Sequence, residues 1–113
     1  MQKVKLTGMK HLEGVDVQSS TDVASTLATL GFTVLVAEGA DGTRGKKADL
    51  ALIQIKVNAV SIGSGTLTTA NGLTFEVGEF ILLETEEEIT NTKFISAVAG
   101  AHGTIHAQIG YSN

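Results

Sequence analysis

The 113-residue sequence contains no cysteine and no proline, and only 4% of it is aromatic. Without cysteine, the chain has no disulfide framework, no thiolate metal site and no cysteine nucleophile. Without proline, sharp turns depend on the 13 glycines, together with asparagine and aspartate. The lack of tryptophan and the single tyrosine argue against stacking of sugars or single-stranded nucleic acid on exposed rings.

Long apolar runs are also missing. No stretch approaches the roughly 18 apolar residues of a membrane-spanning helix, and the opening MQKVKLTGMKHLEG lacks the apolar block of a signal peptide. We therefore expect a chain that is made in the cytoplasm and does not enter a membrane. Apolar residues still make up 42% of the sequence, which is enough for one folded domain over residues 1–113.

The charge is slightly acidic and unevenly spread. A net charge of −4 argues against a nucleic-acid partner. Most of the acidic excess lies in the second half of the chain, in a run that we interpret as a solvated loop: Glu84, Glu86, Glu87 and Glu88.

Alternating apolar and polar residues predict strands in the second half of the chain. Period-two alternation puts one set of side chains on a buried face and the other in water. It is clearest at residues 104–111 and recurs at residues 73–77; residues 80–84 and 93–99 complete a run of four short strands. With turn signals between them and no helical pattern over residues 50–111, the fold class is mostly β: an antiparallel sandwich or small barrel. The residues expected to face the core in the last strand are Ile105, Ala107, Ile109 and Tyr111.

The first half of the chain is less regular. Residues 1–12 suit an edge strand or an arm that docks on a neighbouring subunit, and Val15 and Val17 suggest a short strand. Residues 21–30 favour a short helix ended by Gly31, with a strand as the alternative. Residues 32–37 and 50–61 predict two further strands, and Asn71-Gly72 predicts a hairpin.

Groups that could carry chemistry do not form a recognisable motif. His102 and His106 are four residues apart but fall in a turn and a strand, without the glutamate of a zinc-binding helix. Adjacent glutamates in one loop do not provide two carboxyl groups in different environments. No arrangement of serine, histidine and aspartate can be argued. We therefore predict no catalytic, cofactor-binding or metal site, and no enzyme.

Two sets of residues are candidates for contacts between chains. The apolar run Phe80, Ile81 and Leu82 exceeds what a domain of this size needs for its own core. The basic residues Arg44, Lys46 and Lys47 lie in a glycine-rich loop that could meet an acidic segment of a neighbouring copy. The acidic members of that second set are Glu86, Glu87 and Glu88.

The C-terminal part, roughly residues 72–111, resembles small virion structural proteins of tailed bacteriophages. The similarity lies in NGLTFEVGEFILLE, a polar stretch leading into ITNTKFISAVAG, and a closing strand GTIHAQIGY. The resemblance implies a non-enzymatic β-sandwich subunit, of the capsid decoration or head-fibre type, that forms a homo-oligomer (a trimer favoured) and binds a major capsid or other virion protein. The alternative hypothesis is a host-surface or glycan-binding β-module.

Overall fold

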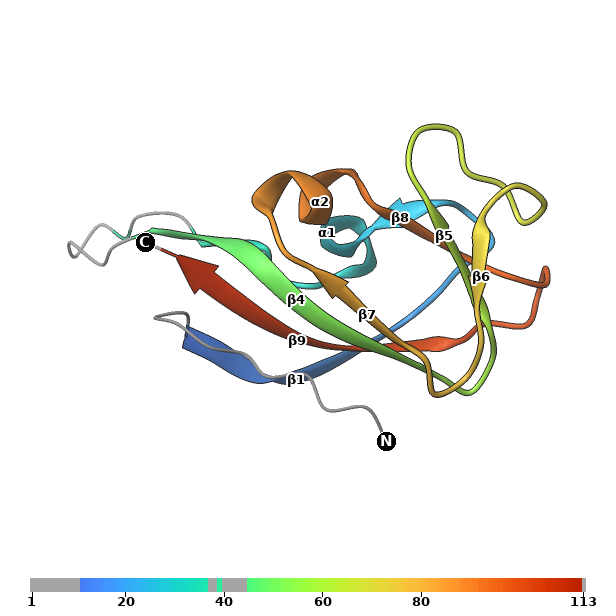
Figure 1. Cartoon of the computed structure of the whole chain (residues 1–113), viewed down its shortest axis with the longest axis horizontal. Coiled ribbons are helices and arrows are strands. Elements are labelled where there is room, and N and C mark those ends of the chain that lie inside the picture. Colours follow the sequence, from blue (N-terminus) through green and yellow to red (C-terminus); the bar gives the residue numbers. More distant parts are fainter. Residues whose placement is uncertain (1–10, 37–38, 40–44, 113) are drawn as a thin grey trace.

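The computed structural model describes residues 11–36, 39 and 45–112, which form two antiparallel sheets and two short helices (Figure 1). The prediction of a mostly β, antiparallel architecture is therefore confirmed, and the sheets curl into a half-barrel. The arm or edge strand expected at residues 1–12 lies outside the described residues, except that His11 and Leu12 begin the first strand.

The 11-residue strand β4 (Lys46–Lys56) is the centre of the first sheet. One edge of β4 pairs along most of its length with β9 (Thr104–Ser112), which pairs in turn with β1 (His11–Ser19). The other edge of β4 pairs with β3 (Leu35–Val36) and then with β7 (Phe80–Leu83). Figure 1 shows β1, β9 and β4 running side by side.

The second sheet is smaller. Its order is β2 (Ser25–Thr26), β8 (Lys93–Ser96), β5 (Val60–Gly63) and β6 (Leu73–Phe75). The expected hairpin at Asn71-Gly72 is wrong in its length, because Ile62 pairs with Leu73 and residues 64–72 form a long loop. The Asn71 side chain stabilises this loop by accepting from the Thr68 amide at 2.7 Å.

Helix α1 (Leu27–Leu30) is shorter than the helix expected at residues 21–30. Ser25 and Thr26 pair with β8, so their backbones are committed to a strand, and Thr26 becomes the N-cap. Gly31 ends the helix in the left-handed conformation, with φ of 113°, as the sequence predicted.

Helix α2 (Glu86–Asn91) replaces the acidic loop that we expected. Thr85 caps it by accepting from the Glu88 amide at 3.0 Å, and the Glu88 carboxylate accepts from the Glu84 amide at 3.2 Å. Three glutamates in the first turn favour the helix because that end carries partial positive charge. Ile89 points into the core, so α2 closes one side of the half-barrel.

The hydrophobic core lies between the inner face of the first sheet and a cover made by the helices and the second sheet. Alternate residues of β9 and β4 face it, so the burial predicted for the last strand is confirmed for Ile105, Ala107 and Ile109, whereas Tyr111 is only partly buried. The core side chains from the first sheet are Ala51, Ile53, Ile55, Ile81, Leu83, Ile105, Ala107 and Ile109, and those of the cover include Leu27, Phe32, Val60, Ile62, Ile89 and Phe94.

The burial expected at β6 is wrong. Leu73 and Val77 are exposed, and only Phe75 packs against the core. β6 lies at the edge of the second sheet, where it has a neighbour on one side only among the described strands. Alternation identified two faces at this edge strand, but neither of them is fully covered.

The single long strand expected at residues 50–61 is in fact two strands in different sheets. The chain turns at Val57, whose φ of 75° lies in the left-handed region that β-branched residues rarely adopt. The Asn58 side-chain amide donates to the His102 carbonyl at 3.0 Å, which anchors the turn to a distant loop. The strand break is therefore set by a tertiary contact.

The strand expected at residues 32–37 is shorter in its described part, residues 32–36: Leu35 and Val36 pair with β4, and the Val34 carbonyl accepts from the Ala48 amide at 2.8 Å. The amide of Phe32 donates to the Leu27 carbonyl at 3.0 Å as part of the helix ending, and its ring is buried in the core. The start of this apolar segment thus belongs to a helix cap.

Candidate functional site

The face of the first sheet that points away from the core carries a group of solvent-facing apolar side chains. We call it the outer face and define it by Val15 and Val17 of β1, Leu52 of β4, and Phe80 and Leu82 of β7. The exposed fractions are 60% for Val15, 49% for Val17 and 39% for Phe80. A shallow groove of about 210 Å³ runs over this face, lined also by Gln54, Lys56, His106 and Gln108.

The strand register arranges these side chains in two rows. Val15 pairs with Gln108, Gln108 with Leu52, and Leu52 with Leu82. In the next row, Val17 pairs with His106, His106 with Gln54, and Gln54 with Phe80. Because directly opposite side chains on paired strands touch, each row crosses the four strands as one continuous strip.

The predicted apolar contact residues are divided between two faces. Phe80 and Leu82 lie on the outer face, whereas Ile81 points inward and is 8% exposed as part of the core. Ile81 therefore serves folding, and the surface available to a partner consists of every second residue of β7.

The predicted charged contact residues are partly satisfied within one chain. Arg44 lies outside the described residues, and Lys46 and Lys47 begin β4 instead of lying in the expected loop, because they pair with Val36 and Leu35. The Lys47 ammonium lies 3.6 Å from a carboxylate oxygen of Glu86 at the start of α2. Glu87 and Glu88 are exposed on the same helix. Lys47 and Glu86, which we expected to meet between two copies, therefore form an ion pair within one subunit.

A polar cluster joins three segments that are far apart in the sequence. The hydroxyls of Ser20 and Ser96 lie 2.8 Å apart, and the Ser96 hydroxyl lies 2.8 Å from Nδ1 of His102. An Asp22 carboxylate oxygen lies 3.8 Å from the same ring nitrogen. The Gly103 amide donates to the Ser20 hydroxyl at 2.9 Å.

This cluster contains serine, histidine and aspartate, but its geometry is not that of a catalytic triad. In a triad, the carboxylate and the serine face opposite ring nitrogens, whereas Ser96 and Asp22 both face Nδ1 of His102. Ser96 and Ser20 are completely buried, so neither hydroxyl can reach a substrate. The cluster holds the loop before β9 against the segment that follows β1 and against the end of β8.

His106 lies on the outer face, where Nε2 is 3.1 Å from the Thr104 hydroxyl. Across the part of the chain that the structure describes, no three His, Asp or Glu side chains gather as a metal site requires. In that same part, no helix is long and apolar enough to cross a membrane.

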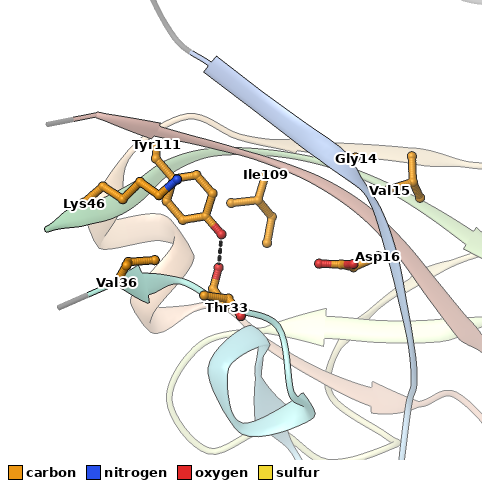
Figure 2. A pocket seen from close by; sticks show the side chains of 8 residues that line it. All are labelled: Gly14, Val15, Asp16, Thr33, Val36, Lys46, Ile109 and Tyr111. Atoms are coloured by element: carbon orange, nitrogen blue, oxygen red, sulfur yellow. Dashed lines mark hydrogen bonds between the residues drawn. The ribbon is translucent and has the colours of Figure 1, made fainter. Parts of the chain in front are cut away.

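A second concave feature lies on the opposite side of β1, where the half-barrel is open toward α1 and β3. It is an open cleft of about 360 Å³ lined by eight residues. Figure 2 shows the Asp16 carboxylate pointing from β1 across the cleft toward Ile109 and Tyr111. On the far wall, the Tyr111 hydroxyl donates to the Thr33 carbonyl, and the Lys46 ammonium lies 4.8 Å from the centre of the Tyr111 ring. The other lining residues are Gly14, Val15 and Val36.

Comparison with known proteins adds no relative: no family model, curated protein or solved structure matches this chain.

Sequence reasoning missed the cleft because its walls come from four separate segments. One signal was present in the sequence: Asp16 lies between Val15 and Val17, so it faces the opposite side of the strand from both valines. In the structure Asp16 pairs with Ala107, whose side chain is in the core.

Proposed function

We propose that this protein is a non-enzymatic structural subunit of a bacteriophage virion, of the capsid decoration or accessory type. Its outer face would pack against a second copy or against another virion protein. The observation that carries the proposal is the outer face, where Val15, Val17, Leu52, Phe80 and Leu82 lie in two rows that also contain Gln108, His106 and Gln54. The phage setting rests on the resemblance of residues 72–111 to virion structural proteins.

The chemistry of the outer face suits a protein partner. Exposed apolar side chains grouped on one face, rather than scattered singly, favour contact with another macromolecule. Val15, Val17 and Phe80 retain enough exposed surface to contribute a few kcal/mol, on the order of 1 kcal/mol each, when covered. Such a contact is weak on its own but becomes firm when repeated over a lattice.

The shape of the outer face favours a flat partner. The strips are formed by paired strands, so a second sheet could pack on them at about 10 Å, as the layers of a sandwich do. The polar side chains within the rows, Gln54, His106 and Gln108, lie on the central strands and would form hydrogen bonds inside such a contact. A symmetric homo-oligomer would use the same face on every copy.

The test is whether the chain is a stoichiometric part of phage particles. Particles of the phage that encodes it should contain the chain after density-gradient purification, in a fixed ratio to the major capsid protein by quantitative mass spectrometry. Cryo-electron microscopy should place the outer face against a neighbouring subunit. A chain recovered only as free monomer, absent from purified particles, would contradict the proposal.

A pair of variants localises the contact. Val17→Lys places a cation on the outer face beside His106 and should reduce incorporation into particles. Val23→Lys adds the same charge at a valine that is 71% exposed and lies outside the sheets, and it should leave incorporation unchanged. Equal incorporation of both variants would show that another surface makes the contact.

A further inference from the structure

The cleft between β1 and β3 has features of a ligand site that the proposed virion role does not use. Its volume of about 360 Å³ lies in the range of small-molecule sites, roughly 300–1,000 Å³. Val36 contributes apolar surface to it, and Ile109 lies beneath it, almost fully buried. Its two walls carry polar groups, with Asp16 on one side and Tyr111 on the other (Figure 2).

The far wall is held in place before any ligand arrives. Tyr111 is fixed at both ends of its side chain, by its strand and by the hydrogen bond from its hydroxyl to the Thr33 carbonyl. The Lys46 ammonium lies over the ring in a cation–π contact. A wall fixed in this way loses little conformational freedom on binding, which favours affinity.

The near wall is shaped by an irregularity in β1. The register of β1 against β9 shifts between Leu12 and Val15, which is a β-bulge, and Gly14 lies within it. A Cβ added at Gly14 would meet no atom within 4 Å, so the space beside this glycine is open. The bulge keeps Val15 on the outer face and turns Asp16 inward, toward the cleft.

We propose that this cleft binds a neutral monosaccharide unit of a glycan. A sugar has an apolar C–H face and an edge of hydroxyls, which match the Val36 side chain and the polar groups on the walls. The Asp16 carboxylate can accept hydrogen bonds from two neighbouring hydroxyls. The described residues that line the cleft carry one carboxylate and one ammonium, so they add no net charge that would select a phosphate or another anion.

The openness of the cleft sets the expected strength of binding. A single sugar on a shallow site should bind with a dissociation constant on the order of millimolar. Several copies of the subunit on one particle would raise the effective affinity for a surface that displays many sugars. The inference does not rest on the virion proposal, because the two features share Val15 alone among their lining residues and the Asp16 carboxylate faces the cleft.

The experiment is a titration of the isotope-labelled chain with the methyl glycosides of galactose, glucose and mannose, followed by amide chemical shifts. At least one glycoside should give saturable shifts at concentrations up to about 100 mM, as millimolar binding requires. The shifts should be confined to residues 14–16, to Thr33 and Val36, and to residues 109–111. Saturable binding of none of the three glycosides would overturn the proposal.

Three variants decide whether the cleft is responsible. Asp16→Asn keeps the size of the side chain but weakens its acceptor, and it should reduce affinity about tenfold or more. Gly14→Leu should fill the cleft and abolish binding, while the amide spectrum shows that each variant is folded. Glu87→Gln, the matched control, removes an exposed carboxylate on α2 and should change nothing.

Two outcomes would overturn the assignment even if shifts are seen. Binding that survives both Asp16→Asn and Gly14→Leu would place the ligand elsewhere. Binding of a zwitterionic amino acid, such as serine, but of none of the glycosides would mean that the paired charges select a different class of ligand. Asp16 would then have no role in sugar binding, and its inward charge would serve to discourage strand pairing at the β1 edge.

Discussion

Gly103 shows how strictly a single position can be constrained in this fold. A Cβ at this residue would stand 2.1 Å from the Asn58 carbonyl oxygen, a distance that no real contact allows. Gly103 is also bonded to Ser20 in both directions, through its amide and its carbonyl. The backbone therefore has little room to move aside.

We expect Gly103→Ala to lower the free energy of unfolding by about 2–3 kcal/mol or more, because overpacking against backbone is hard to relieve. Urea denaturation followed by circular dichroism measures this change. Gly14→Ala is the control: its Cβ would meet open space, so its effect should stay within about 0.5 kcal/mol. Equal stability of the two variants would contradict the close approach at Gly103.

Val57 is a second residue whose backbone departs from what its side chain prefers. It is the single non-glycine residue with positive φ in the described chain, at 75°, and its side chain is 66% exposed. Asparagine tolerates this conformation better, by about 1 kcal/mol. Val57→Asn should therefore raise the melting temperature by about 4–8 °C.

Val98 provides the matched control for that measurement. It is equally exposed, at 65%, and its φ is not positive. Val98→Asn should bring no stabilisation in differential scanning calorimetry. A similar rise for both variants would mean that surface polarity, rather than relief of backbone strain, accounts for the gain.

At the scale of elements, α2 depends on its N-terminal cap. The Thr85 hydroxyl accepts from the Glu88 amide, and the helix is only six residues long, so losing that bond removes much of its local support. Thr85→Ala should lower the free energy of unfolding by about 1 kcal/mol. Thr90→Ala, within the same helix and exposed, should be neutral or slightly stabilising. A denaturation midpoint unchanged by Thr85→Ala would show that packing of Ile89 alone holds the helix.

The elements also show what the sequence could predict. β9 was predictable because period-two alternation places Ile105, Ala107 and Ile109 inward whatever their neighbours are. Helix α2 was predictable too, since Thr85 followed by Glu88 is a capping-box pattern, but the run of glutamates suggested a solvated loop. The turn at Val57 was not, because it depends on a hydrogen bond from Asn58 to a loop more than 40 residues away.

The candidate surfaces were harder to predict than the strands. Alternation at Val15 and Val17 identifies two faces of β1 but not which face is covered. The cleft brings together β1, the segment after α1, β4 and β9, and no short motif reports that arrangement. Residue pairing across the sheets, which the linear sequence does not contain, decides both features.

At the scale of the whole molecule, two kinds of force are candidates for the proposed contact between copies. The outer face predicts an apolar contact, whereas the basic and acidic residues predict an ionic one. The Lys47–Glu86 pair within one chain reduces the charge that is available for the ionic contact. Both side chains of that pair are more than half exposed, so salt should screen it readily.

We therefore expect self-association that is insensitive to salt. Light scattering should give a mass that is a multiple of 11.7 kDa, with three copies favoured. That mass should persist, or increase, between about 0.05 and 0.5 M sodium chloride, because apolar contacts are not screened while ion pairs are. Val17→Lys should shift the protein toward monomer at every salt concentration, and Lys47→Gln should have little effect. If salt dissociated the oligomer and Lys47→Gln did the same, the ionic contact would be the correct one. Salt shortens the Debye length and so weakens the attraction between unlike charges on neighbouring copies, whereas it leaves apolar contacts intact.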